Sequence, residues 1–203
     1  MLLYLIRHGE TPLNVARVLQ PADTPLSERG QRQAQALAQR LRDAGLGGVL
    51  SSDLPRARHT ADIVAEACGV AAKSTALLRE RDFGELRGRP YDGLGFDPLA
   101  MAEAPPGGES MDAFYARCLS AWDDLLQRQQ ALGAPLAVVT HGLVLRAWLQ
   151  SGRLALGGLS LAGPVGNTAL SIVDAAPPHR VQLLACTRHL DADAHDAHSL
   201  SGG

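Results

Sequence analysis

The sequence is poor in cysteine and in aromatic residues, and it carries almost no net charge. Its 203 residues include three cysteines and 4% aromatic residues, and the formal net charge is −2. An odd number of widely spaced cysteines argues against a disulfide framework, so each cysteine is interpreted as a small core residue. The near-neutral charge and the few aromatic residues argue against nucleic-acid binding, which needs a basic surface and stacking side chains.

Long apolar stretches are missing as well. The first apolar run, Met1 to Ile6, is interrupted by Arg7 too early for a signal peptide, and no stretch is long enough to span a bilayer. The sequence therefore predicts a cytoplasmic protein with no membrane partner. A chain of 203 residues is long enough for one core, and we expect a single domain over residues 1–203.

Strand patterns and helix patterns alternate along the chain. Short apolar runs predict strands at residues 1–6, 49–50, 135–140, 168–174 and 181–186. Apolar stripes at helical spacing predict helices at residues 27–42, 55–68 and 110–132. This alternation predicts an α/β fold with three layers, in which a mostly parallel central sheet carries helices on both faces.

Two segments do not follow these patterns. Residues 85–109 are rich in glycine and proline and lack periodicity, and a loop of this length in a compact domain is usually functional. We therefore expect an inserted lid there. Residues 191–203 have no core pattern either, and we expect a flexible tail rather than a metal site. Their potential metal ligands are Asp191, Asp193, His195, Asp196 and His198.

Two of the predicted strands end in a histidine that a glycine follows. The first strand runs into Arg7-His8-Gly9, and the third runs into Thr140-His141-Gly142. Ligands of α/β sheets bind beyond the carboxyl ends of the strands, where a cation and an imidazole suit catalysis. The alternative for each segment alone is a strand end with solvated polar residues, because so short a match also recurs by chance.

Two further segments carry charged residues, one directly after a predicted strand and the other directly before a glycine. Ser51-Ser52-Asp53-Leu54-Pro55-Arg56 follows the second strand and begins a helix, and Leu78-Arg79-Glu80-Arg81-Asp82-Phe83-Gly84 combines acid and base before a glycine. Taken in this order, the four segments resemble the motifs of the histidine phosphatase superfamily, also called the phosphoglycerate mutase-like family. The resemblance covers about residues 1–190.

The resemblance implies a phosphatase that acts on a small phosphorylated metabolite. It makes His8 the nucleophile, Arg7 and Arg56 the phosphate-binding residues, and Glu80 the general acid, while His141 completes the cationic pocket. These roles fit the side chains, because a guanidinium binds two phosphate oxygens, an imidazole can attack phosphorus, and a protonated carboxyl can protonate the leaving group. Asp82 and Glu85 are close enough in sequence to compete with Glu80 for the acid role.

A second set of residues is expected to bind the substrate. By the resemblance, Asn14 and Gln20 match polar groups that contact the phosphoryl group, although a turn or capping role fits them equally well. Gly142 presents its backbone there, and Asn167 either closes the pocket or caps its strand. Gly9 lets the chain turn and a ligand approach closely. Thr11 completes the set.

The sequence departs from the family's pattern after the general acid. Leu86-Arg87-Gly88 stands where the family often has an aromatic residue, an acidic residue and glycine. With Arg79, Arg81 and Arg89, it forms a basic cluster, which is either a solvated charged loop or a binding site for a second anionic group on the substrate.

We expect no cofactor and no metal, because arginines and histidines already supply positive charge. A phosphoglycerate mutase is the alternative enzyme, which the resemblance associates with a longer insert after the general acid than this chain has. A non-catalytic protein that binds phosphorylated ligands is the alternative from another class. The apolar faces are also compatible with a homodimer.

Overall fold

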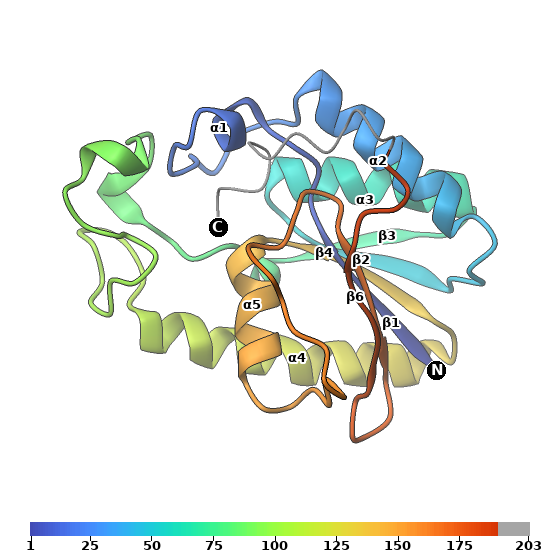
Figure 1. Cartoon of the computed structure of the whole chain (residues 1–203). Helices are drawn as coiled ribbons and strands as arrows, with labels where there is room; N and C mark the ends of the chain where they lie inside the picture. The colour runs from blue at the N-terminus through green and yellow to red at the C-terminus, as the bar shows by residue number, and fades with distance from the viewer. Residues whose placement is uncertain (191–203) are drawn as a thin grey trace.

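Within residues 1–190, which the computed structural model describes, six strands form one sheet (Figure 1). The strand order is β3-β2-β4-β1-β5-β6. Neighbouring strands run parallel, except that β5 is antiparallel to both β1 and β6. The predicted mostly parallel sheet is therefore confirmed. The strands are β1 (Leu2–Arg7), β2 (Gly48–Ser52), β3 (Ala72–Thr75), β4 (Leu136–Thr140), β5 (Leu170–Asp174) and β6 (Val181–Cys186).

Helices cover both faces of this sheet, which confirms the three-layer fold. Figure 1 shows α2 and α3 on one face and α4 and α5 on the other. The α-helices are α1 (Pro12–Val15), α2 (Glu28–Leu41), α3 (Pro55–Cys68), α4 (Met111–Leu132) and α5 (Gly142–Gln150). Short 3₁₀ segments lie at η1 (Ala76–Leu78), η2 (Gly84–Leu86) and η3 (Tyr91–Gly93).

Capping residues mark the ends of the long helices α2 and α4. Ser27 accepts a hydrogen bond from the backbone N–H of Gly30 at the start of α2, and Ser110 does the same for Ala113 at the start of α4. Gly133 ends α4 in the left-handed conformation that glycine adopts without strain. The predicted ends of these helices agree with the observed ones within one residue.

Alternate residues of the central strands point into two separate cores. Leu5 of β1 and Val138 of β4 face the core that contains α4 and α5, whereas Ile6 and Val139 face the core that contains α2 and α3. All four side chains are buried. This two-sided burial explains why β1 and β4 are continuous apolar runs rather than alternating ones.

Two short elements are not predicted by the sequence. Strand β3 lies at the edge of the sheet and is largely exposed, so its residues Ala72–Thr75 have no apolar pattern to reveal it. Helix α1 has only four residues, which is too short for a helical stripe.

The segment predicted as a lid begins against the loop that follows α1. The backbone N–H of Gly88 donates to the Leu19 carbonyl at 2.7 Å, and that of Leu19 donates to the Arg89 carbonyl at 2.9 Å. Arg81 donates to the carbonyls of Glu103 and Glu109 near the segment's other end. The single domain stays a prediction, and the predicted tail, residues 191–203, lies outside the described residues.

The cysteines are all free thiols, as their spacing predicts, but only one belongs to the core. Cys118 is buried, whereas Cys68 and Cys186 are half-buried. The sulfur of Cys186 lies 3.3 Å from a guanidinium nitrogen of Arg40. Within the part of the chain that the structure describes, no helix is long and apolar enough to cross a membrane.

Helix α2 packs against the loop after β1 through two glycines. A Cβ atom on Gly9 would lie 2.5 Å from the carbonyl oxygen of Gly30, and a Cβ atom on Gly30 would overlap the backbone of Glu10. The space that Gly9 leaves is therefore filled by α2. A contact between the backbone of Gly9 and the substrate stays a prediction.

We expect Gly30→Ala to lower the free energy of unfolding by about 1–3 kcal/mol, because the backbone of Glu10 has to shift to admit the methyl group. Gly163→Ala is the control, since a Cβ atom there meets nothing within 4 Å. Urea denaturation of both variants measures the difference. Equal stability of the two variants would contradict this packing.

Candidate active site

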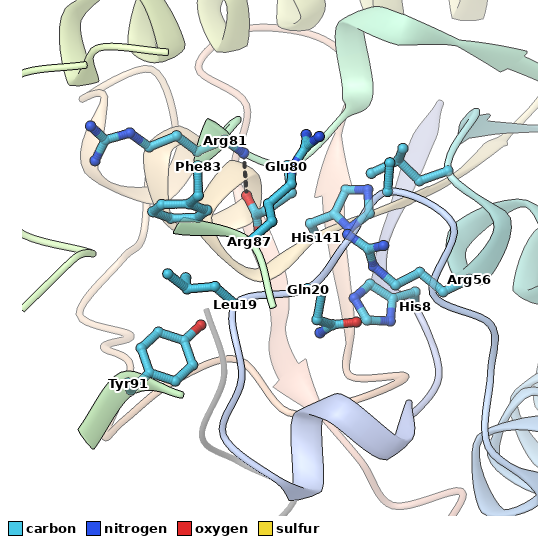
Figure 2. Close-up of a pocket in the computed structure, with 12 residues that line it drawn as sticks. His8, Leu19, Gln20, Arg56, Glu80, Arg81, Phe83, Arg87, Tyr91 and His141 are labelled. Atoms are coloured by element: carbon cyan, nitrogen blue, oxygen red, sulfur yellow. Dashed lines mark hydrogen bonds between the residues drawn. The ribbon is translucent and has the colours of Figure 1, made fainter. Parts of the chain in front are cut away.

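A pocket lies beyond the carboxyl ends of β1, β2 and β4, and Figure 2 shows the residues around it. The space between its atoms is about 410 Å³, a figure that includes open solvent. The residues that line it are His8, Leu19, Gln20, Ala22, Leu54, Arg56, Glu80, Arg81, Phe83, Arg87, Tyr91 and His141.

The two histidines meet because their strands are neighbours in register. Arg7 at the end of β1 pairs with Thr140 at the end of β4, so the next residues, His8 and His141, leave the sheet side by side. Their ring centroids are 5.1 Å apart. The backbone N–H of His8 also donates to the Thr140 carbonyl at 2.9 Å, which fixes where the chain leaves the sheet.

The imidazole of His8 is held in one tautomer. Its Nδ1 lies 2.7 Å from the carbonyl oxygen of Gly9. Because a carbonyl can only accept, Nδ1 carries the proton and Nε2 keeps its lone pair. Burial, followed by the charges of Arg56 and Arg7, lowers the pKa of His8 well below 6.5. His8 is therefore a neutral imidazole with Nε2 available for bond formation.

His141 is buried and neutral for similar reasons. Burial, followed by the charges of Arg56, His8 and Arg7, lowers its pKa well below 6.5. Neither ring nitrogen has a hydrogen-bond partner among the described residues. The sequence predicts that His141 adds positive charge, but these surroundings favour a neutral imidazole that can donate one hydrogen bond. An anion beside it would raise its pKa again.

Arg7 and Arg56 bring two buried positive charges to this place. Burial is the main reason that the pKa of each falls to about 10, so both stay charged at neutral pH. Arg56 lies in the first turn of α3 and donates to the Pro21 carbonyl at 3.3 Å. Arg7 donates to the Val165 carbonyl and does not line the pocket itself, although its charge acts on His8.

Glu80 faces these cations across the pocket. Its two carboxylate oxygens accept backbone hydrogen bonds from Arg81 and Leu143, both at 3.1 Å. Burial raises the pKa of Glu80 above 4.5, and this effect exceeds the lowering by the two N–H groups and by Arg56 and Arg7. The environment therefore favours a protonated carboxyl more than water does.

The two other candidates for the acid role are placed elsewhere. Asp82 forms an ion pair with Arg87 at 3.0 Å and accepts a hydrogen bond from the backbone of Gly84. Glu85 is exposed, and neither carboxylate lines the pocket. Glu80 alone of these three carboxylates lines it.

The predicted substrate-binding residues form a layer next to the pocket, and of these only Gln20 lines it. The hydroxyl of Thr11 donates to Gln20 at 2.9 Å and caps α1 by accepting from Asn14. The side-chain amide of Asn167 donates to the His8 carbonyl at 3.1 Å and to Asn14 at 3.2 Å. Gly142 begins α5 without lining the pocket. Capping and bracing are thus the contacts observed for Thr11, Asn14 and Asn167.

Several residues of this region are not predicted by the sequence. Leu19 and Tyr91 line the pocket but belong to no local motif.

His189 lies outside the pocket, where its Nε2 is 3.0 Å from the hydroxyl of Thr168 and its Nδ1 is 3.2 Å from a guanidinium nitrogen of Arg40. Because Arg40 can only donate, Nε2 of His189 carries the proton and donates to Thr168.

Further hydrogen bonds connect Thr168 to the end of β1. The hydroxyl of Thr168 donates to the Asn167 carbonyl at 2.8 Å, and the backbone N–H of Thr168 donates to the Arg7 carbonyl at 3.1 Å. Thr168 has a φ of 53°, an unfavourable value for a β-branched residue. The contact with His189 therefore holds a strained residue beside the end of β1.

Burial and the charge of Arg40 lower the pKa of His189 to about 4. The unfolded chain takes up a proton near pH 6.5, whereas the folded protein does so only near pH 4, so stability falls as the pH drops through this range. In urea denaturation we expect the stability advantage over His189→Gln to be constant above about pH 6.5 and to shrink towards pH 4. An advantage that does not change with pH would contradict the placement of His189.

The comparisons with known proteins agree with this geometry. The model of the histidine phosphatase superfamily (branch 1) matches residues 3–186, so the chain belongs to this superfamily. The chain is 38% identical over 159 residues to a probable phosphoglycerate mutase, GpmB, of Yersinia pestis. The aligned region covers 73% of each protein.

Solved structures share the fold over almost the whole chain. YhfR of Bacillus stearothermophilus superposes with a TM-score of 0.79 at 28% identity and covers 94% of this chain and 99% of its own. A putative alpha-ribazole-5′-P phosphatase of Escherichia coli gives 0.78 at 27% identity, with 92% and 97% covered. A mycobacterial glucosyl-3-phosphoglycerate phosphatase in complex with VO3 gives 0.73 at 29% identity, with 90% and 96% covered.

Proposed function

We propose that the protein is a phosphatase that hydrolyses a small phosphorylated metabolite through a phosphohistidine on His8. The observation that carries this proposal is the state of His8, a neutral imidazole whose Nδ1 proton is held by Gly9 beside Arg56 and Glu80. Family membership and structural neighbours described as phosphatases support it.

In the first step, Nε2 of His8 attacks phosphorus and the ester P–O bond breaks. Arg7 and Arg56 stabilise the charge on the phosphoryl oxygens, and His141 donates one hydrogen bond. The leaving oxygen takes the proton of the Glu80 carboxyl and departs as an alcohol. The products of this step are phosphohistidine and the Glu80 carboxylate.

In the second step, water attacks the same phosphorus and the P–N bond breaks. The Glu80 carboxylate takes a proton from this water, and His8 returns to its neutral form as inorganic phosphate is released. Asn14 and Gln20 contribute polar groups near the phosphoryl site, and the buried amide nitrogen of Asn14 has no hydrogen-bond partner among the described residues. No metal or cofactor has a part in either step as proposed.

A mutase is the second candidate, because the relative from Yersinia pestis is described as a probable phosphoglycerate mutase. Both reactions share the phosphohistidine, and they differ in whether water or a second hydroxyl accepts the phosphoryl group. Release of inorganic phosphate without an isomeric ester distinguishes hydrolysis from transfer. A protein that only binds phosphorylated ligands would give neither product.

We expect a phosphoenzyme to be trapped when the reaction with ³²P-labelled substrate is quenched in alkali, because phosphohistidine is stable there and labile in acid. His8→Ala should remove the label, whereas His59→Ala, a change at an exposed position on α3, should keep it. The label should form equally in EDTA. A label that persists in His8→Ala would exclude His8 as nucleophile, and loss of the label in EDTA would exclude the metal-independent mechanism.

Glu80→Gln keeps the size of the side chain but removes the transferable proton. We expect its single-turnover phosphorylation rate to fall more for an alkyl phosphate than for p-nitrophenyl phosphate, because nitrophenolate leaves without a proton. Asp82→Asn is the matched control and should show no such contrast. Equal losses with both leaving groups in Glu80→Gln would move the acid role to another residue.

A further inference from the structure

The pocket has two chemically different ends. Figure 2 shows His8, Arg56 and His141 together at one end, where the phosphoryl group is proposed to bind. Leu19, Phe83 and Tyr91 lie away from them, on the other side. If the phosphoryl group binds at the first end, the leaving part of the substrate lies at the second end, beside Leu19, Phe83 and Tyr91.

Besides Arg56, the pocket lining contains Arg81 and Arg87, and the Arg81 guanidinium donates to the carbonyls of Glu103 and Glu109. Arg87 lines the pocket, and it belongs to the segment predicted as a lid. Its charge acts on the phosphoryl end, because the pKa of Arg56 is lowered by burial first and by the charges of Arg7 and Arg87 in addition.

Arg87 is bound less completely than the other arginines nearby. Arg79 contacts Asp53 through two nitrogens, both at 2.7 Å, and Arg117 contacts Glu109 through two nitrogens at 3.0 and 2.7 Å. Within residues 1–190, the ion pair of Arg87 is a contact from Nη2 to Asp82 at 3.0 Å, and that carboxylate oxygen is shared with the N–H of Gly84. The rest of its guanidinium can therefore bind an anion with two oxygens.

The backbone around Arg87 fixes its place on the pocket wall. Its own N–H donates to the Gly84 carbonyl at 3.2 Å, and the next residue, Gly88, donates to Leu19 at 2.7 Å. The Arg87 side chain is one-third exposed. A ligand can therefore reach the guanidinium, and the backbone hydrogen bonds hold the residue in a defined position before the ligand binds.

Tyr91 adds a neutral donor to this end of the pocket. Burial, followed by the charge of Glu80, raises its pKa to about 12, so its hydroxyl keeps its proton at physiological pH. The backbone N–H of Tyr91 donates to the Arg17 carbonyl at 2.9 Å, which anchors the residue. Arg87 and Tyr91 line the same pocket as the apolar side chains of Leu19 and Phe83, and this combination suits a short carbon chain that ends in an anionic group.

We propose that Arg87 binds a second anionic group on the leaving part of the substrate, so that the preferred substrates are phosphate monoesters of small acids. This inference rests on the proposed function, because it assumes that the phosphoryl group binds at His8. A carboxylate and a second phosphate present the same chemistry to a guanidinium, and the test separates them.

The test compares phosphate esters that share one carbon chain. Phosphorylated 3-hydroxypropanoate carries a carboxylate, 1,3-propanediol bisphosphate carries a second phosphate, and propyl phosphate carries neither. The measured quantity is kcat/KM for each anionic ester relative to propyl phosphate, in the wild type, in Arg87→Gln and in Arg89→Gln. Arg89 is the matched control, because it is a neighbouring arginine that is exposed and does not line the pocket.

We expect the wild type to prefer at least one anionic ester, and Arg87→Gln to reduce this preference about tenfold to hundredfold, the usual loss for a hydrogen bond to a charged group. Arg87→Lys should retain part of it, and Arg89→Gln all of it. Which ester is preferred identifies carboxylate or phosphate. Absence of any preference, or an Arg87→Gln variant that weakens all three esters equally, would overturn the inference.

Failure of the proposed function gives a different result. In that case none of the three esters is hydrolysed in a reaction that depends on His8. Binding of 4-phosphonobutanoate and of butylphosphonate, measured by calorimetry, then tests Arg87 without any turnover. Tighter binding of the carboxylate-bearing phosphonate that is lost in Arg87→Gln supports the subsite, and equal binding of both compounds contradicts it.

Discussion

The parallel pairing of β1 with β4 is the contact on which the candidate site depends. It places the last residues of both strands, Arg7 and Thr140, in register, and His8 and His141 follow at the same edge of the sheet. Close packing in both cores holds this pairing, because a shift by one residue would exchange the side chains that fill each core. The same packing that stabilises the fold therefore fixes the distance between the two imidazoles.

The electrostatics of the pocket follow from burying several ionisable groups together. Arg7 and Arg56 are buried in the same place, which is unfavourable for folding but attracts a phosphoryl dianion. Burial, followed by the charges of these arginines, lowers the pKa of His8 and His141, and burial raises the pKa of Glu80. One arrangement thus suits the proposed nucleophile, proton donor and anion site. Sites of this kind often sacrifice some stability for function.

The segment after Glu80 is held in place by contacts with α4. Arg117 of α4 donates to the carbonyls of Leu77, Arg79 and Glu80 and binds Glu109 through two nitrogens. A single side chain therefore connects the segment of Glu80, the proposed general acid, to the end of the predicted lid. This bracing explains how a segment rich in glycine and proline can present Arg87 and Tyr91 to the pocket in a defined position.

The sequence by itself determined the layers, the strand ends and the motifs that identify the family. Apolar periodicity and capping residues such as Ser27 and Ser110 act locally, so they can be recognised without coordinates. It did not reveal β3, whose exposed edge has no apolar pattern, or Tyr91 and His189, which stand in no local motif. It left Glu80, Asp82 and Glu85 as competing acids. Only the tertiary structure separated them, because burial, the partner of each carboxylate and the neutral state of His141 depend on residues far apart in the chain.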